Sequence, residues 1–256
     1  MLLVVDVGNT HVVLGVYKEK QLLNHWRIKT DRDHTADELA VMLNGLLAMD
    51  NLILRDISGI IVACVVPPMA PAWERLAKGL GLPPLFVNDP RLRLSMQVLI
   101  DHPEELGADR LVNAVAAYER YHTALIVVDF GTATTFDCIS EDGAYLGGAI
   151  VPGITISLDA LFQRAAKLPR VDISKPPRTV IGKNTVDAIK SGVLYGYAGL
   201  VDGLVTRIRA ELAPALPRVI ATGGLAELIS PYTDSIQETI PLLTLEGLQL
   251  IHEHNN

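Results

Sequence analysis

One short phrase occurs twice in this chain, and it limits the possible folds more than any other feature. Residues 4–10 read VVDVGNT, and residues 127–134 read VVDFGTAT. In both copies an apolar, β-branched run predicts a buried strand, and the glycine after it marks a place where the backbone turns or closely approaches another group. The repetition predicts a duplicated fold with two phosphate-facing loops, one at Asp6 and one at Asp129.

The composition is compatible with two packed halves, which we expect at residues 1–118 and 119–256. Hydrophobic residues make up 49% of the 256 residues and charged residues 20%, which is ordinary for an α/β protein. The formal net charge of -7 argues against a nucleic-acid binder, because affinity for a phosphate backbone comes from clustered Lys and Arg. A small anion held by backbone N–H groups remains compatible with this charge.

The amino terminus and the cysteines indicate an intracellular protein. MLLVVDVGN has no positively charged segment and predicts a first strand, not a signal peptide. No apolar stretch approaches the length of about 20 residues that spans a membrane, so we expect no membrane contact and a cytoplasmic location. Cys64 and Cys138 lie in apolar runs and are interpreted as buried small side chains, without a disulfide or a thiol metal site.

Hydrophobic periodicity predicts similar elements in the two halves. In the first half the expected strands are 2–7, 12–18, 22–29 and 57–66, and the expected helices are 36–49, 70–80 and one that begins near residue 107. In the second half the expected strands are 125–129, 134–140, 145–151 and 218–222, and the expected helices are 155–167, 185–211 and 224–230. Residues 85–105 are expected to be irregular, and residues 252–254 to be a frayed, solvated end.

Polar residues follow each copy of the apolar run. Asp6 offers a carboxylate for Mg²⁺ and its waters, Gly8 allows close backbone approach, and Asn9 and Thr10 offer donors to phosphate oxygens. An ordinary hairpin turn uses the same residue types, but the second copy favours a ligand site. Gly223 and Gly224 follow a predicted strand and form a third close-approach site, suited to the flat side of a nucleotide.

Asp109 falls in the first turn of the helix predicted to begin near residue 107. The positive end of the helix dipole favours its ionised form and predicts a lowered pKa. Such a carboxylate can orient a hydroxyl and collect its proton late in a phosphoryl transfer. The alternative is simple stabilisation of the helix start, with Arg110 as an ion-pair partner. Helix initiation explains Thr35 and Glu38 as a capping box, whereas it leaves the adjoining residues 30–32 unexplained, and an approach of these residues to the site stays open.

The order of the motifs identifies a resemblance to the type III pantothenate kinases, within the superfamily of acetate kinase, sugar kinases, heat-shock ATPases and actin. The matching motifs are DVGNT at 6–10, TDR at 30–32, TADE at 35–38, CVVPP at 64–68, GADR at 107–110, DFGTATT at 129–135, GGAIVPG at 147–153, RAAKLP at 164–169 and GKNT at 182–185. Together they cover nearly the whole chain. The resemblance implies an α/β fold of duplicated ribonuclease H-like, actin-like halves, each a mixed sheet flanked by helices.

The resemblance implies ATP-dependent phosphorylation of pantothenate to 4'-phosphopantothenate, the first step of coenzyme A biosynthesis. Asp6 would face Mg²⁺ through water, and Thr132 would touch a nucleotide phosphate. The residues expected to hold the ATP phosphates are Asp6, Val7, Gly8, Asn9, Thr10, His11, Val12 and Val13. Asp129 would bind a monovalent cation, K⁺ or NH₄⁺.

The resemblance also implies a substrate site and a homodimer. Asp109 would be the catalytic residue that accepts the proton of the primary hydroxyl of pantothenate. The expected substrate contacts are Gly107, Ala108, Asp109, Arg110 and Thr185, in a site near a subunit interface.

The chain departs from its relatives on the substrate side. Many relatives have a Gly-Pro-Gly turn and, seven positions before the glycine of GADR, an aromatic residue; here residues 88–91 read NDPR and the aligned residue is Ile100. We expect a changed pocket wall at Ile100 and unchanged chemistry. Two alternatives stay open: a non-catalytic regulatory relative of the same fold, and a kinase of another small alcohol. The three carboxylates at positions 6, 109 and 129 weigh against the first.

Overall fold

The chain forms two compact units in a computed structural model that describes residues 1–165 and 167–255. Unit 1 comprises Met1–Gln97, Asp101–Arg120 and Leu243–Asn256, and unit 2 comprises Val98–Ile100 and Tyr121–Leu242. Each unit has its own sheet and its own hydrophobic core. The units are discontinuous in sequence, whereas the halves expected at 1–118 and 119–256 are continuous, and that division stays a prediction.

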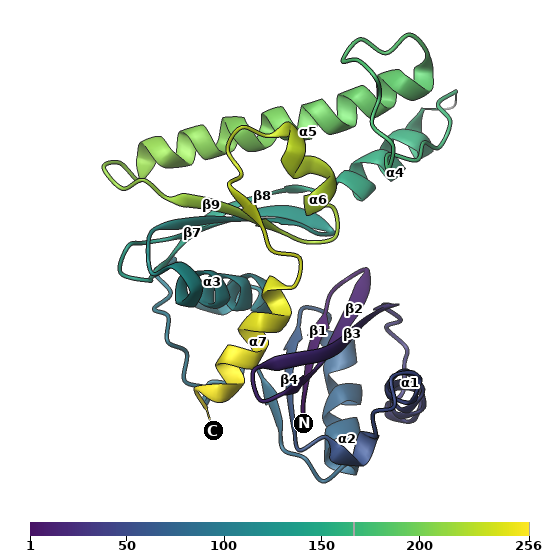
Figure 1. Cartoon of the computed structure of the whole chain (residues 1–256), viewed down its shortest axis with the longest axis vertical. Helices are drawn as coiled ribbons and strands as arrows, with labels where there is room; N and C mark the ends of the chain where they lie inside the picture. The colour runs from purple at the N-terminus through teal and green to yellow at the C-terminus, as the bar shows by residue number, and fades with distance from the viewer. Residues whose placement is uncertain (166, 256) are drawn as a thin grey trace. The chain divides into compact units, whose positions relative to one another are not determined.

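Unit 1 is built on a five-stranded mixed sheet in the order β3-β2-β1-β4-β5 (Figure 1). Its strands are β1 (Leu2–Val7), β2 (His11–Lys18), β3 (Gln21–Lys29), β4 (Gly59–Cys64) and β5 (Pro84–Phe86). The first three form the expected antiparallel meander, and β4 and β5 continue the sheet in parallel. The central strand β1 is almost entirely buried, as its run of apolar residues predicts. β4 is shorter than expected, and β5 lies in a stretch predicted to be irregular.

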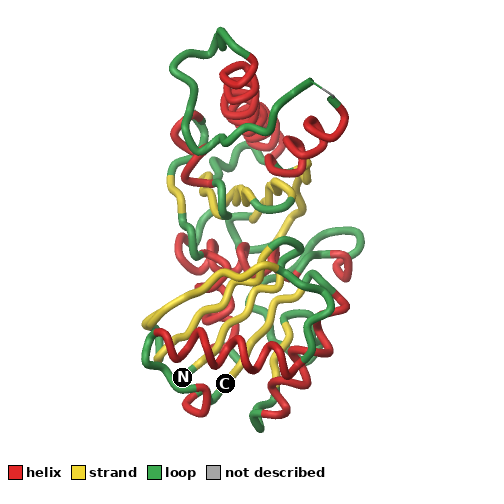
Figure 2. The backbone as a smooth tube through the Cα atoms, turned by 90° about the vertical axis from the view of Figure 1, so that its right-hand side faces the viewer, coloured by secondary structure: helices red, strands yellow, loops and turns green. Residues whose placement is uncertain are grey.

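Helices α1 (Ala36–Met49) and α2 (Ala70–Gly79) cover one face of this sheet (Figures 1 and 2). Their buried side chains, Leu43 and Trp73 among them, form one core with Val5 and its neighbours on the strands. The predicted capping box starts α1: the Glu38 N–H donates to the Thr35 hydroxyl, and the Thr35 N–H donates to the Glu38 carboxylate over 2.8 Å. Such a cap stabilises a helix by about 1 kcal/mol.

Helix α7 (Leu243–Glu253) packs against β1, β2 and β4, and α3 (Ala108–Tyr121) packs against α7. The two helices touch closely at Gly247, where an added Cβ would lie 2.4 Å from the carbonyl oxygen of Val112. The expected frayed, solvated end is wrong for His252, which is half-buried on α7, whereas Glu253 and His254 are exposed as expected. His252 packs against Gly59 at the start of β4, and the Asn255 side chain bonds both the N–H and the carbonyl of Arg93.

Unit 2 contains a second five-stranded sheet, in the order β10-β9-β6-β7-β8. Its strands are β6 (Leu125–Phe130), β7 (Ala133–Ile139), β8 (Tyr145–Pro152), β9 (Arg218–Thr222) and β10 (Glu238–Thr239). β6 pairs with β7 in antiparallel and with β9 in parallel, as β1 does with β2 and β4. The predicted duplication is confirmed by this identical strand order and direction. The two-residue strand β10 was not predicted.

One face of the second sheet is covered by α4 (Ile154–Arg164), α5 (Thr185–Glu211) and α6 (Ala226–Ile229). The long helix α5 crosses this sheet (Figure 1) and buries Leu194, Val201 and Val205 against Phe136 and its neighbours. The bounds predicted for α5 are confirmed. The remaining short helices of the chain are the 3-10 turns Leu54–Asp56, Pro67–Met69, Pro103–Glu105 and Ser230–Tyr232.

Two further expectations bear on the class of protein. Cys138 is buried, Cys64 is half-buried, and the two cysteines are not joined in a disulfide. Within residues 1–165 and 167–255, no helix combines the length and apolar character needed to cross a membrane.

Candidate active site

The first Asp-x-Gly loop joins β1 to β2 at the carboxyl end of the central strand. Asp6 pairs with Val13 on β2 and with Ala63 on β4. The Gly8 N–H donates to the carbonyl of His11 over 3.0 Å, which closes the turn. Asn9, Thr10 and His11 are exposed, whereas Val7 and Val12 are fully buried. A ligand at this loop would therefore meet the backbone of the valines and not their side chains.

Three titratable side chains at or beside this loop are Asp6, Cys64 and His11. Asp6 is half-buried next to Cys64 on β4, and the pKa of the Cys64 thiol is raised by burial and by the negative charge of Asp6. Cys64 donates to the carbonyl of Val66, so it acts as a protonated, small side chain. Although His11 is exposed, partial desolvation of its imidazole and the nearby positive charge of Arg27 lower its pKa, which favours the neutral form.

Thr30, directly after β3, holds the first loop at two points. Its N–H donates to the carbonyl of Thr10 over 3.0 Å, and its hydroxyl donates to the carbonyl of Gly8 over 2.6 Å. From the same segment, the Arg32 guanidinium lies 3.4 Å from the side-chain oxygen of Asn9. Two of the residues unexplained by helix initiation, Thr30 and Arg32, thus contact the loop.

The second Asp-x-Gly loop joins β6 to β7 and is enclosed by backbone. Asp129 pairs with Thr135 on β7 and with Thr222 on β9, the places that correspond to the partners of Asp6. The Gly153 N–H donates to the carbonyl of Thr132 over 3.2 Å. An added Cβ at Gly153 would lie 2.2 Å from that same oxygen, so only glycine fits there without displacing the loop.

Gly223 makes a close approach, as expected, but to the chain itself. Its φ of +91° lies in the region that favours glycine. An added Cβ at Gly223 would lie 2.3 Å from Asp129 Oδ1 and 2.7 Å from the backbone of Phe130. The carboxylate of Asp129 therefore accounts for this glycine without a nucleotide. Gly224 is exposed.

The GADR motif forms the start of α3. The Leu111 N–H donates to the carbonyl of Gly107, and the Arg110 N–H donates to Asp109 Oδ1 over 2.8 Å. An added Cβ at Gly107 would lie 2.6 Å from Asp109 Oδ1, so the glycine makes room for the carboxylate. Ala108 is buried beneath it.

The prediction of a lowered pKa for Asp109 is wrong. Burial raises the pKa of this carboxyl, and the N–H and positive charge of Arg110 oppose the shift without reversing it. The sequence places the residue in the first helical turn but does not reveal how far its side chain is desolvated. A raised pKa makes Asp109 more basic than expected, which suits a proton acceptor.

The two places where the chain departs from its relatives lie in different units. Ile100 is in unit 2, where the adjoining Leu99 N–H bonds the carbonyl of Tyr145 and where Ile100 lies within 3.6 Å of an added Cβ at Gly147. The 88–91 turn is in unit 1. There Asp89 and Pro90 help to line a pocket of about 470 Å³. The Arg91 Nε–H donates to both carboxylate oxygens of Asp89, and this pairing lowers the pKa of Asp89 to about 2.

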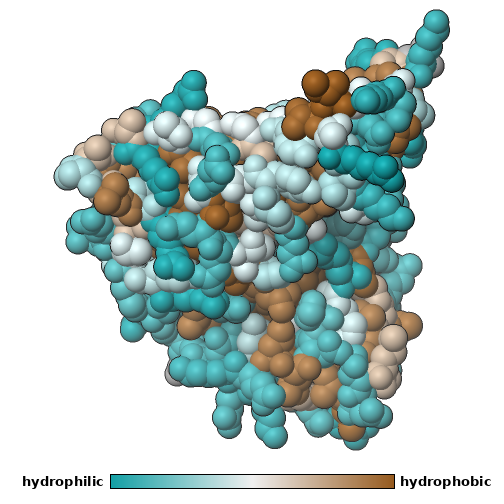
Figure 3. Space-filling model, turned by 45° about the horizontal axis from the view of Figure 1, so that its top comes forward, coloured by the Kyte–Doolittle hydropathy of each residue, from teal (hydrophilic) through white to brown (hydrophobic). Residues whose placement is uncertain are grey.

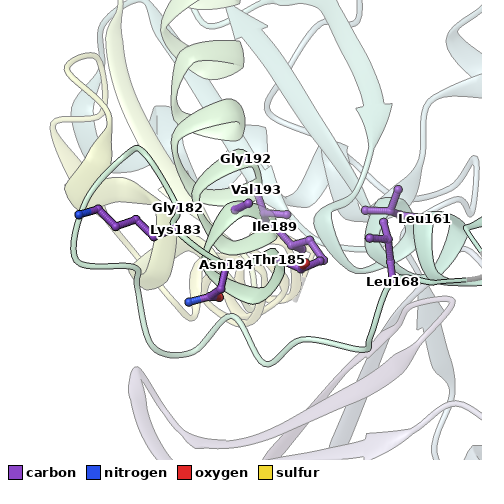
Figure 4. Close-up of a pocket in the computed structure, with 10 residues that line it drawn as sticks. Leu161, Leu168, Gly182, Lys183, Asn184, Thr185, Ile189, Gly192 and Val193 are labelled. Atoms are coloured by element: carbon purple, nitrogen blue, oxygen red, sulfur yellow. The ribbon is translucent and has the colours of Figure 1, made fainter.

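Thr185 lies at the start of α5, beside a pocket of about 640 Å³ within unit 2 (Figure 4). The Asn184 side chain caps the helix by accepting from the Asp187 N–H over 2.9 Å. Leu161 and Leu168 form an apolar end of the pocket, and the Lys183 side chain extends away from that end (Figure 4). Ala166, inside the RAAKLP motif, lies outside the described residues.

The protein side chains near the first loop fit a magnesium ion that is held mostly by water and phosphate oxygens. In the part of the chain that the structure describes, no three His, Cys, Asp or Glu side chains converge on one point. Mg²⁺ in phosphoryl-transfer sites commonly keeps several waters and takes one or two carboxylates besides the phosphates. A single half-buried carboxylate at Asp6, at the loop expected to face phosphate, fits that arrangement.

The expected residues thus fall into separate groups. In unit 1, residues 6–13 form the first loop and residues 107–110 form the start of α3. In unit 2, Asp129, Thr132 and Gly223 come together, while Thr185 belongs to the pocket beside α5. Sequence reasoning missed Gly153, although the GGAIVPG motif that contains it was noted.

Comparisons with known proteins agree on one family. The family model described as type III pantothenate kinase matches residues 2–207. A type III pantothenate kinase of Desulfatibacillum aliphaticivorans is 54% identical over 99% of this chain and 98% of its own. One from Geobacter sulfurreducens is 52% identical over 100% of this chain and 99% of its own.

The comparison with solved structures agrees with the expected fold. A structure described as a conserved putative Baf family transcriptional activator from Campylobacter jejuni matches with a TM-score of 0.60 at 20% identity. The match covers 99% of this chain and 98% of that one. Together with the two sheets of identical order, this likeness confirms the fold of two mixed sheets flanked by helices.

Proposed function

The chain belongs to the type III pantothenate kinase family, and from this premise we propose how its residues divide the work. The enzyme transfers the γ-phosphoryl group of ATP to pantothenate, with a divalent metal ion, in the first step of coenzyme A biosynthesis. The proposal concerns the finer assignment: which residues hold ATP, which accept the proton, and which bind the monovalent cation. One observation carries it, namely the half-buried carboxylate of Asp109 at the start of α3, which accepts from the Arg110 N–H over 2.8 Å.

Asp109 is proposed as the residue that accepts the proton. The primary hydroxyl oxygen of pantothenate attacks the γ-phosphorus of ATP, the bond from that phosphorus to the β–γ bridging oxygen breaks, and ADP departs. The hydroxyl proton passes to the Asp109 carboxylate. The transition state of phosphoryl transfer is loose, so the base acts late and chiefly orients the hydroxyl. The raised pKa and the space left by Gly107 support this assignment.

The first Asp-x-Gly loop, residues 6–13, is proposed to hold the ATP phosphates. Support comes from its exposed polar tip at Asn9 and Thr10 and from the half-buried carboxylate of Asp6. Asp6 would hold Mg²⁺ through water, and the ion would neutralise phosphate charge. In the second unit, Thr132 and Gly224 are proposed to contribute to the nucleotide site.

Asp129 is proposed to hold K⁺ or NH₄⁺. The supporting observation is close packing of backbone: an added Cβ at Gly223 would lie 2.3 Å from Asp129 Oδ1, and one at Gly153 would lie 2.2 Å from the carbonyl oxygen of Thr132 in the same loop. A small cation with oxygen ligands suits such a site better than a triphosphate. Its replacement by Na⁺ or by a large organic cation in the assay buffer tests this assignment, since turnover is expected to fall in either case.

Residues 107–110 are proposed to contact pantothenate. The roles of Thr185 and Ile100 as substrate contacts stay predictions, and the pocket beside Thr185, which combines an apolar end with a polar rim, supports a small-molecule site within unit 2. Five apolar side chains of α4, the loop before α5 and the start of α5 are exposed: Ile156, Leu161, Val180, Ile181 and Val186. Figure 3 shows hydrophobic groups among hydrophilic ones on the visible face of the molecule. The five exposed side chains support a homodimer, which light scattering tests. A cytoplasmic location stays a prediction.

One assay tests the proposed chemistry. Purified protein is supplied with ATP, Mg²⁺ and K⁺, and ADP release is followed with pantothenate present and omitted. Pantothenate-dependent release is expected. Release that appears only with another small alcohol would favour the alternative kinase, and the absence of release with either would favour a regulatory relative.

A further inference from the structure

Thr30 makes two hydrogen bonds to the first Asp-x-Gly loop, one from its backbone and one from its side chain. β2 and β3 are antiparallel, and their register continues past the strand ends, so that the Thr30 N–H reaches the carbonyl of Thr10. That bond would form with any residue except proline. The second bond, from the Thr30 hydroxyl to the carbonyl of Gly8 over 2.6 Å, depends on the side chain.

The duplication supplies a comparison at this position. Gly153 follows β8 as Thr30 follows β3, and its N–H likewise bonds the last loop residue, Thr132. There the backbone of Gly153 closely approaches the loop, and a Cβ added to Gly153 would lie 2.2 Å from the carbonyl oxygen of Thr132. The residue after the third strand thus contacts the Asp-x-Gly loop in both units, by a hydroxyl in one and by close backbone approach in the other.

The hydroxyl bond orients a peptide group of the loop. A trans peptide is planar, with its C=O and N–H on opposite sides. Since the Gly8 carbonyl is directed at Thr30, the Asn9 N–H of the same peptide points away from Thr30. A fixed N–H group facing outward from a turn is the kind of donor that binds phosphate oxygens.

We propose that Thr30 is a positioning residue for ATP, which sets the direction of the Asn9 N–H through its bond to Gly8. The proposal rests on the assignment of residues 6–13 to the ATP phosphates. Thr30 acts through the loop and needs no contact with the nucleotide. Without the hydroxyl, the Gly8–Asn9 peptide is free to rotate, and the phosphates lose one preset donor.

The test compares Thr30→Val, which keeps the branched shape, with Thr30→Ser, which keeps the hydroxyl. In Thr30→Val the KM for ATP is expected to rise about tenfold, the effect of losing one hydrogen bond to a charged group. The KM for pantothenate is expected to stay within about twofold of wild type in the same assay. Thr30→Ser is expected to restore the KM for ATP. Calorimetric titration of MgATP without pantothenate should give the same order of affinities.

Two controls separate this role from general stability. Thr233→Val removes a similar hydroxyl bond, to the carbonyl of Ser230 over 3.0 Å, and is expected to leave both KM values unchanged. Thermal unfolding of every variant identifies loss of folded protein, which lowers the apparent kcat without moving KM. An unchanged KM for ATP in Thr30→Val, or equal shifts in Thr30→Val and Thr30→Ser, overturns the proposal.

Asp6→Asn separates the proposed role of Thr30 from the assignment of residues 6–13 to the ATP phosphates. If Asp6→Asn weakens ATP and Thr30→Val does not, the phosphate loop stands and the role of Thr30 is overturned. If Asp6→Asn leaves ATP affinity unchanged, the loop assignment itself fails and the Thr30 proposal fails with it.

Discussion

The two Asp-x-Gly loops occupy the same place in two sheets of the same strand order, yet their surroundings differ. The first loop has exposed polar residues at its tip, and its Gly8 carbonyl accepts a hydrogen bond from the Thr30 hydroxyl. The second loop, in contrast, is in close contact with the backbone of Gly153 at Thr132 and with that of Gly223 at Asp129. In both units the residue after the third strand contacts the loop, and we expect it to influence which ligand each copy accepts.

The largest expected effect concerns Asp109, which belongs to neither loop. Asp109→Asn is expected to lower kcat by about 10²–10⁴-fold, the usual contribution of a general base. If Asp6 or Asp129 accepted the proton instead, Asp109→Asn would keep most of its turnover. Steady-state ADP release measures the effect.

The same variant is expected to be more stable than wild type at neutral pH. Burial raises the folded-state pKa of Asp109 above its unfolded value, so folding favours the protonated carboxyl. The stability from this group is fully present below the unfolded pKa and is lost as the pH rises through the folded pKa. Asn imitates the neutral form at every pH. Urea unfolding at pH 7 should therefore show a higher midpoint for Asp109→Asn, and a lower midpoint would contradict the burial argument.

The enclosure of the second loop is tested by adding a single methyl group. Gly153→Ala is expected to destabilise the protein by about 2–3 kcal/mol, because the new Cβ meets backbone that cannot move aside cheaply. Gly8→Ala is expected to cost less, about 1 kcal/mol, since its one close atom, the His11 carbonyl oxygen, would lie 3.0 Å away. Gly45→Ala on α1 has nothing within 4 Å and serves as the control, with a gain of up to about 1 kcal/mol. Equal losses at Gly8 and Gly153 in urea unfolding would break the distinction between the loops.

A smaller effect is expected from Arg110, the residue next to the proposed proton acceptor. Its positive charge lowers the pKa of Asp109 against the larger effect of burial. Arg110→Gln removes that charge and is expected to move the acid limb of kcat/KM to higher pH. The limb is read from initial rates across the pH range. A limb that stays in place would mean that another group titrates in the wild-type profile.

The smallest expected effect is at Arg32, exposed beside the tip of the first loop. Arg32→Gln is expected to raise the KM for ATP about twofold at low salt and not at high salt, because exposed charges are screened. Arg55→Gln, another arginine of unit 1, is the matched control and should leave the KM unchanged. A twofold change that persists at high salt would indicate a specific contact instead of a surface charge.

Much of the fold could be predicted because its signals are local. The capping box at Thr35 and the apolar spacing after it set α1, and the β-branched runs set β1 and β6. The missed elements lack such signals. β5 and β10 have two or three residues each and owe their existence to pairing with a neighbouring strand, and α7 is a short helix whose stability comes from packing on β1 and α3.

The site was predicted less completely, for a physical reason. Motif order identified Asp6, Asp109 and Asp129 as positions of interest, but a motif does not report desolvation. The helix dipole predicts a lowered pKa for Asp109, and burial, a property of the folded chain, outweighs it. The contacts of Thr30 and Gly153 with the loops likewise depend on strand register, which the sequence alone does not specify.

We propose that the two loops have diverged: Asp6 acts at the ATP phosphates, and Asp129 binds a monovalent cation. The direct measurement is the initial rate over a grid of ATP and K⁺ concentrations for wild type, Asp6→Asn and Asp129→Asn. We expect Asp6→Asn to raise the KM for ATP about tenfold or more, with its K⁺ requirement unchanged. Asp129→Asn is expected to raise the K⁺ concentration for half-maximal rate by a similar factor, with a smaller effect on ATP at saturating K⁺. If both variants shift both parameters equally, or the effects are exchanged, the two loops do not divide the work in this way.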